Sequence, residues 1–203
     1  MNSQTALKQL AELEKLGNVM RLAAEEWSAE WQTLISIICS ARTRDEVTIK
    51  VCTQLFAIYP TLDTLAKANL KDIEKLIRSI NFYKNKSKSV SNCAKALLEK
   101  HQGKVPHNIN DLIELPGVGR KTANVFLAEY GTDALGIDTH VSYISQKLKW
   151  TKNKDPHKIE QDLAKLFPKN YWRKINSNLV RFGKTHMSRK KKDSILKEIG
   201  NKK

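Results

Sequence analysis

The most informative stretch of the sequence is LPGVGRKT at residues 115–122. Apolar residues at helical spacing precede it at Leu112 and Ile113, and others follow it from Ala123 to Tyr130. Two glycines separated by one residue permit a tight turn at which the backbone approaches a ligand closely. The first N–H groups of the following helix then point outward at an anion. The stretch therefore predicts two helices joined by a phosphate-binding hairpin.

Such a short glycine-rich turn is a weak signal by itself, because many helix pairs need one. Here basic residues and a hydroxyl follow the glycines directly, at the end of the helix where the backbone favours an anion. We therefore expect the phosphate contacts to come from Gly117, Val118, Gly119, Arg120 and Thr122.

Two further side chains in this region are candidates for chemistry. Lys121 lies in the first turn of the predicted helix, and a plain phosphate-contacting lysine is the alternative to a nucleophile. Asp138 lies in GIDTH at residues 136–140, ahead of apolar residues at helical spacing, so it is predicted near a helix N-cap. An aspartate that only caps its helix is the alternative there. Two helix N-termini separated by a single helix could face one cleft.

The rest of the chain shows helical spacing throughout and no convincing alternating strand, so the fold class predicted is all-α. Ser28, Asp45 and either Asn110 or Asp111 are expected to begin helices. Further helices are expected at about 4–16, 70–80, 90–98, 120–130, 138–149, 156–167 and 170–183.

Charge and cysteine content indicate the partner and the compartment. The chain has 203 residues and a net charge of +15, from 36 Lys and Arg against 21 Asp and Glu, which favours a nucleic-acid partner over a merely solvated basic surface. Cys39, Cys52 and Cys93 form no CxxC pair and are expected to be buried, reduced thiols. No apolar run is long enough to span a membrane, so we expect a soluble protein of the cytoplasm, associated with the nucleoid.

Residues 115–140 resemble the endonuclease III branch of the helix-hairpin-helix/GPD DNA glycosylase superfamily, with its LPGVGRKTAN segment followed by DTH. CSARTRD at residues 39–45 is similar to the family's LSAQTTD-type segment, and INFY at 80–83 with Lys86 is similar to its IGLY–K loop. LVRFGK at 179–184 resembles the helix before the family's iron–sulfur loop.

The resemblance implies a bifunctional glycosylase and lyase. Lys121 matches the lysine that attacks the sugar C1′, displaces the damaged base and forms a Schiff base, after which β-elimination cuts the strand 3′ to the lesion. Asp138 matches the carboxylate that assists this attack. Expected substrates are duplex DNA with oxidised or ring-saturated pyrimidines, and abasic sites. The alternatives are a monofunctional glycosylase for alkylated or mismatched bases, and a non-catalytic DNA-binding module.

The implied fold has two helical lobes with a DNA-binding cleft between them. A six-helix barrel is expected at 23–133, with the helix-hairpin-helix at about 110–130. Residues 1–22 and 134–203 would form the second lobe, with a basic tail at 184–203. We expect a monomer.

Further DNA contacts are implied on both lobes. Phe82 is expected to be a wedge that fills the space left by the flipped nucleotide, with core packing as the alternative. Hairpins of this family often hold a structural cation on their backbone carbonyls, which places such a site near Leu115 and Val118. The other contacts expected are Arg42, Lys84, Lys86, His140, Lys190, Lys191 and Lys192.

The chain departs from the family pattern in two regions. The family usually carries four C-terminal cysteines that bind a [4Fe–4S] cluster, but no cysteine follows Cys93, so no cofactor is expected. Instead, Met187 and a weak helix around Ile195, Leu196 and Ile199 are predicted to pack onto the second lobe; a disordered tail is the alternative. Near the wedge, Asn81 replaces Gly, Phe82 replaces a small aliphatic residue and Arg42 replaces Gln, which puts base preference in doubt.

Overall fold

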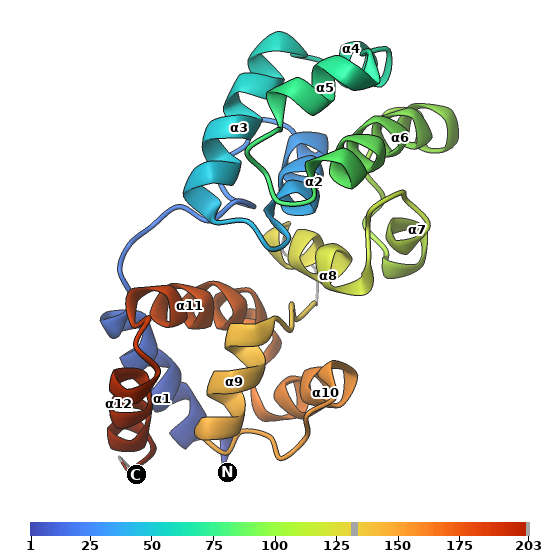
Figure 1. Ribbon diagram of the computed structural model, residues 1–203. Helices are drawn as coiled ribbons and strands as arrows, with labels where there is room; N and C mark the ends of the chain where they lie inside the picture. The colour runs from blue at the N-terminus through green and yellow to red at the C-terminus, as the bar shows by residue number, and fades with distance from the viewer. Residues whose placement is uncertain (131–133, 202–203) are drawn as a thin grey trace. The chain divides into compact units, whose positions relative to one another are not determined.

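The computed structural model describes residues 1–130 and 134–201. All regular elements in these ranges are helices, which confirms the all-α prediction (Figure 1). None of the helices described is long and apolar enough to cross a membrane. The chain divides into two compact units, Arg21–Glu129 and Met1–Met20 with Tyr130–Lys203, which we call the hairpin unit and the terminal unit. The boundary predicted at residue 133 lies outside the described residues.

The hairpin unit is built around one central helix. Residues 32–39 are all buried, and from Leu34 to Cys39 the stretch is apolar or small on every side. The helix that contains them packs against α3, α6 and α8. The unit has seven helical segments where the sequence predicts six: α2 (Glu30–Ser40), α3 (Asp45–Ile58), α4 (Leu62–Ala66), α5 (Leu70–Leu76), α6 (Tyr83–His101), α7 (Ile109–Ile113) and α8 (Arg120–Glu129).

Several predicted helix starts are wrong by one to three positions, because another residue occupies each N-cap: Ala29 for α2, Arg44 for α3 and Asn108 for α7. Ser28 does not cap α2; its hydroxyl donates to Gln32 Oε1. Asp45 lies inside the first turn of α3, where its charge suits the helix dipole. Asn108 caps α7, and its Oδ1 accepts the N–H of Asp111 at 2.9 Å. The short helix α4, capped by Thr61, was not predicted.

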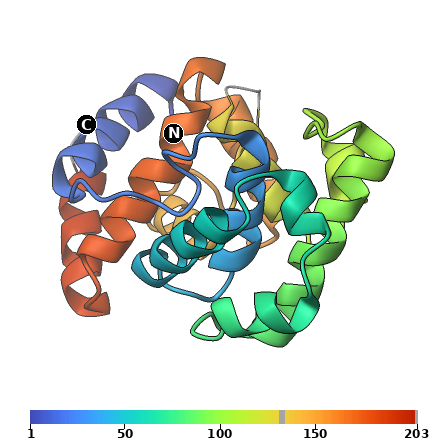
Figure 2. The same cartoon turned by 90° about the horizontal axis from the view of Figure 1, so that it is seen from above.

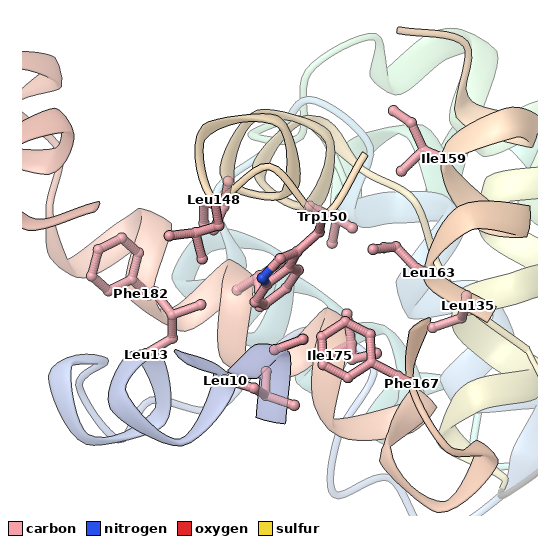
Figure 3. Close-up of a cluster of buried hydrophobic side chains, with 14 of the residues drawn as sticks. Leu10, Leu13, Leu135, Leu148, Trp150, Ile159, Leu163, Phe167, Ile175 and Phe182 are labelled. Atoms are coloured by element: carbon pink, nitrogen blue, oxygen red, sulfur yellow. The ribbon is translucent and has the colours of Figure 1, made fainter. Parts of the chain in front are cut away.

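The terminal unit joins the two ends of the chain around one apolar core. Trp150 lies at the centre of this core (Figure 3). Its indole N–H donates to Gln9 Oε1 at 2.7 Å. The N-terminal helix α1 lies beside α11 and α12 from the C-terminal end (Figure 2). The elements of the unit are α1 (Ser3–Leu16), α9 (Thr139–Lys147), α10 (Pro156–Leu166), a 3₁₀ turn (Lys169–Tyr171), α11 (Trp172–Thr185) and α12 (Arg189–Asn201).

The C-terminal segment is a packed helix as far as it is described. Leu196 and Ile199 of α12 are buried in the core of the terminal unit, and Ile195 packs against it, which confirms this part of the prediction. Met187 is 84% exposed, so its predicted packing is wrong. The reason is its place in the short connection between α11 and α12, which turns the side chain to solvent.

Candidate active site

The two glycines of the hairpin have different roles. Gly117 has φ +82°, and a Cβ built there would lie 2.5 Å from the Cβ of Ser89 on α6, so the fold itself requires glycine. A Cβ built at Gly119 would meet no atom within 4 Å. The backbone at Gly119 is therefore open to an approaching ligand.

The hairpin backbone divides into a structural part and an accessible part. The side chain of Val118 is buried, and its N–H donates to the carbonyl of Leu115 at 3.0 Å. The DNA contact predicted at Val118 is therefore corrected: neither its side chain nor its N–H is offered to a phosphate. A carbonyl has two acceptor positions, so the turn at Leu115 and Val118 stays compatible with a bound cation.

The predicted nucleophile is accessible. Lys121 is the second residue of α8, and its side chain is exposed beside that of Arg120. Thr122 is half-buried one position further along. The first turn of α8 therefore presents an amine, a guanidinium and outward-pointing N–H groups at the same helix end.

Asp138 occupies the N-cap of α9, which confirms its predicted position. Its Oδ1 accepts the N–H of Val141 at 2.8 Å, and the residue is half-buried. The approach to this cap is anchored, because Asn176 on α11 donates its side-chain amide to the Gly136 carbonyl at 2.7 Å. One carboxylate oxygen is thus used by the helix, and a carboxylate has a second oxygen for a substrate.

Gly183 on α11 creates the space for His140. A Cβ at Gly183 would lie 2.1 Å from His140 Nδ1 and 2.8 Å from its Cγ. The imidazole of His140, which follows Asp138 by two residues, therefore packs directly against the α11 backbone. Sequence reasoning missed this role. The available signal was a glycine inside a helical pattern, which disfavours the helix and so needs a packing reason.

Arg42 and Phe82 form an exposed pair with an unusual backbone. Both have left-handed φ angles, 56° and 59°, although neither is glycine. Each such residue costs roughly 1–2 kcal/mol, and strain of this kind tends to lie at functional sites. Phe82 is 59% exposed, so core packing is excluded, and the Arg42 guanidinium carbon lies 5.7 Å from the centre of its ring.

Lys86 is not a surface cation, and its predicted direct DNA contact is corrected. The residue is only 8% exposed. Its ammonium donates to the carbonyls of Cys39 and Ala41, the former at 2.7 Å, and lies 3.3 Å from Thr43 Oγ1. The carbonyls at the C-terminal end of α2 need donors from outside the helix, and here they receive a charged one. Lys84, two residues earlier, is exposed.

The start of α12 is strongly basic and is fixed around Tyr143 of α9. The Tyr143 hydroxyl donates to Asp193, and Lys147 pairs with the same carboxylate at 3.0 Å. The Tyr143 hydrogen bond, followed by that of Lys147, holds the pKa of the Asp193 carboxyl below its usual range. Burial lowers the pKa of the Lys192 ammonium, which lies 5.9 Å from the Tyr143 ring. Lys190 and Lys191 are exposed, and the helix has no acidic residue in its first turn.

The cysteines do not fit an iron–sulfur cluster. Cys39, Cys52 and Cys93 are free thiols buried in the hairpin unit, and burial raises the pKa of the Cys93 thiol to about 12. A [4Fe–4S] cluster is held by four cysteine thiolates, and the chain has three cysteines. Within residues 1–130 and 134–201, no group of three or more His, Cys, Asp or Glu side chains could hold a metal ion.

Comparison with known proteins agrees with this geometry. A family model for HhH-GPD superfamily base excision DNA repair proteins matches residues 35–169. Endonuclease III of Thermotoga maritima is 42% identical over 155 residues, which are 76% of this chain and 73% of that protein. Endonuclease III of Bacillus subtilis is 32% identical over 178 residues, which are 86% of this chain and 81% of that protein.

A solved structure of a trapped covalent intermediate between endonuclease III and DNA, an estranged-adenine complex, is also similar. It is 30% identical, has a TM-score of 0.82, and the match covers 93% of this chain and 89% of that one. The family model, the identities and this coverage agree, and the chain therefore belongs to the endonuclease III family of the HhH-GPD superfamily of base excision DNA repair proteins.

Proposed function

We propose that this chain is a bifunctional DNA glycosylase and AP lyase, which removes oxidised or ring-saturated pyrimidines from duplex DNA and cuts 3′ to abasic sites. The observation that supports this most is an exposed lysine in the first turn of α8, directly after an open glycine turn. A backbone-binding hairpin needs no amine nucleophile, whereas a lyase does. The similarity to a trapped endonuclease III–DNA covalent intermediate supports the same assignment.

Lys121 acts as the nucleophile. Its neutral amine forms a bond to C1′ of the flipped nucleotide while the bond to the base breaks, and the base leaves with the electron pair and takes up a proton. The amine nitrogen loses a proton, the sugar ring opens with protonation of its ring oxygen, and an imine results. Loss of a C2′ proton then expels the 3′ phosphate, and water releases the lysine.

Asp138 stabilises the reaction through its charge. One oxygen caps α9, and this bond fixes the orientation of the carboxylate before the substrate binds. We propose that the second oxygen takes a proton from the amine or stabilises the developing positive charge on the sugar. Assistance of this kind typically contributes about 10²- to 10⁴-fold.

DNA binding is assigned to four surfaces. The open hairpin at Gly119 and Arg120 contacts backbone phosphates, His140 contacts DNA beside the carboxylate, and Lys190 to Lys192 on α12 contact further phosphates. Arg42 and Phe82 enter the base stack and Lys84 adds positive charge beside them. A cation on the carbonyls of Leu115 and Val118 would link the hairpin to a phosphate. We propose that the protein acts as a monomer on chromosomal DNA in the cytoplasm.

We also propose that this family member works without an iron–sulfur cluster. The family's cluster folds a C-terminal loop, and here the packing of Leu196 and Ile199 in the core supports a helix in that part of the chain without metal. The purified protein should be colourless, contain no stoichiometric iron and keep its activity in the presence of a chelator.

A panel of duplexes tests the proposed activity. Duplexes with thymine glycol, uracil, 3-methyladenine or an abasic site are incubated with the protein, with and without borohydride. We expect base release from thymine glycol, strand cleavage at both thymine glycol and abasic sites, and a borohydride-trapped complex. Release of 3-methyladenine or uracil without strand cleavage would indicate the monofunctional alternative, and binding without any cleavage or release would indicate a non-catalytic module.

A further inference from the structure

Two loops of the hairpin unit are tied together where the strained pair is formed. One loop follows α2 and contains Arg42 and Thr43; the other precedes α6 and contains Asn81 and Phe82. Asn81 donates its backbone N–H to Thr43 Oγ1 at 3.1 Å and its side-chain amide to the Arg42 carbonyl. Asn81 therefore holds the first loop at two points, the hydroxyl of Thr43 and the carbonyl of Arg42.

Lys86 adds a further link, between α6 and the loop that follows α2. It extends from the first turns of α6 and donates to the end of α2 at the carbonyls of Cys39 and Ala41, and it also reaches Thr43 Oγ1. Thr43 Oγ1 thus accepts from both Asn81 and Lys86. Burying an ammonium group is unfavourable, and burial lowers the pKa of the Lys86 side chain accordingly. Basic side chains can close a helix end by themselves. Lys86 also bonds Thr43 Oγ1, beyond the last residue of α2, so this arrangement needs a reason beyond ending α2.

The exposed pair supplies that reason. Phe82 and Arg42 point outward from strained backbones, and an exposed aromatic side chain on a mobile loop would lose conformational freedom on entering a base stack. A side chain already fixed in its bound conformation avoids this loss. Strained conformations of this type persist only where the surrounding contacts hold them.

We infer that Lys86, acting with Thr43 and Asn81, is a positioning residue that holds Arg42 and Phe82 as one preformed wedge for the DNA base stack. This inference rests on the proposed function, because the wedge acts only when a nucleotide is flipped from a duplex. Lys86 touches neither substrate nor reacting atoms. It keeps both loops in the conformation in which the Phe82 ring and the Arg42 guanidinium are exposed next to each other.

The test compares excision from duplex DNA with excision from single-stranded DNA, where no stack has to be opened. Lys86→Met removes the ammonium group but keeps an apolar chain of similar length. It should lower the excision rate on duplex by about tenfold or more, because small displacements of positioning groups have effects of this order. Excision from single-stranded DNA should change little. Lys95→Met, which removes an exposed lysine from the same helix, is the matched control and should leave both rates unchanged.

Two further variants keep the test decisive if Lys86→Met does not fold. Thr43→Val removes the shared acceptor at nearly constant shape and should reproduce the duplex-specific loss, whereas Thr43→Ser keeps the oxygen and should restore the rate. Asn81→Ala removes the bond to the Arg42 carbonyl from an exposed position and should give a smaller loss of the same kind. In a Phe82→Ala background, each of these changes should add a smaller duplex-specific loss than in the wild type, because only Arg42 is then left to be positioned.

The outcomes separate this inference from the proposed function. Equal losses on duplex and single-stranded DNA, or a full additional loss in the Phe82→Ala background, would overturn the positioning role while leaving the glycosylase and lyase assignment intact. A wild-type protein without activity on any lesion would refute the proposed function, and the inference with it.

Discussion

Replacing Gly183 by alanine should destabilise the protein, although alanine is the better helix former. The new Cβ would lie 2.1 Å from His140 Nδ1 and 2.8 Å from Cγ, closer than any real contact, so the imidazole must leave its place. Forcing an extra carbon into a packed site typically costs about 1–3 kcal/mol. The gain from replacing glycine inside a helix is about 1 kcal/mol. The net loss is therefore expected to be about 1 kcal/mol.

Thermal unfolding with and without His140 measures this effect. For a chain of this size, about 1 kcal/mol corresponds to a fall in Tm of about 2–4 °C. In a His140→Ala background the obstructing ring is absent, so Gly183→Ala should change sign and raise Tm by a similar amount. Gly200→Ala on α12 is the control, because its Cβ would meet only a Leu148 methyl carbon at 4.0 Å. That change should leave Tm unchanged or raise it.

The functional consequence follows from the position of His140 on the first turn of α9. Displacing the imidazole should weaken DNA binding in Gly183→Ala to about the level of His140→Ala, and the double variant should be no weaker. A Gly183→Ala protein that loses as much stability without His140 as with it would show that the clash lies elsewhere and not at the His140 ring.

Three other changes test the remaining assignments. Asp138→Asn keeps a capping oxygen but removes the charge, so base excision should fall by about 10²- to 10⁴-fold while binding to damaged duplex persists; near wild-type excision would leave Asp138 as a cap only. Gly119→Ala should leave thermal stability unchanged or higher but weaken duplex binding on the order of tenfold, measured by fluorescence anisotropy, because the methyl group meets no protein atom and can obstruct only a ligand. Replacing Lys190, Lys191 and Lys192 together by alanine should flatten the slope of log affinity against log salt by about 1 unit for each phosphate that these lysines bind in the wild type, equally for damaged and undamaged duplex; an unchanged slope would show that α12 does not touch DNA.

The sequence was most informative where a local pattern determines local structure. Helical spacing predicted the all-α class, and an aspartate ahead of such spacing correctly predicted the N-cap of α9. The hairpin could be recognised because its glycines and basic residues are consecutive. Helix starts were less predictable, since Ser28 and Asn108 are both plausible caps and only one of them caps.

The interactions that sequence reasoning missed join residues far apart in the chain. Lys86 follows an exposed loop and another lysine, so nothing local distinguishes it from a surface cation; its burial depends on carbonyls more than forty residues away at the end of α2. The role of Gly183 depends likewise on His140, a residue on a different helix. Met187 was predicted to pack onto the second lobe, but the connection between α11 and α12 turns it to solvent.

Covalent trapping on abasic DNA shows directly whether Lys121 is the nucleophile. The protein is incubated with a duplex that contains an abasic site, reduced with borohydride, digested, and the DNA-linked peptide is identified by mass spectrometry. We predict that the sugar is attached to the side-chain nitrogen of Lys121, that Lys121→Ala forms no trapped complex, and that Lys95→Ala traps as the wild type does. A complex that forms in Lys121→Ala, or a sugar found on another amine, would contradict the assignment of Lys121 as the nucleophile.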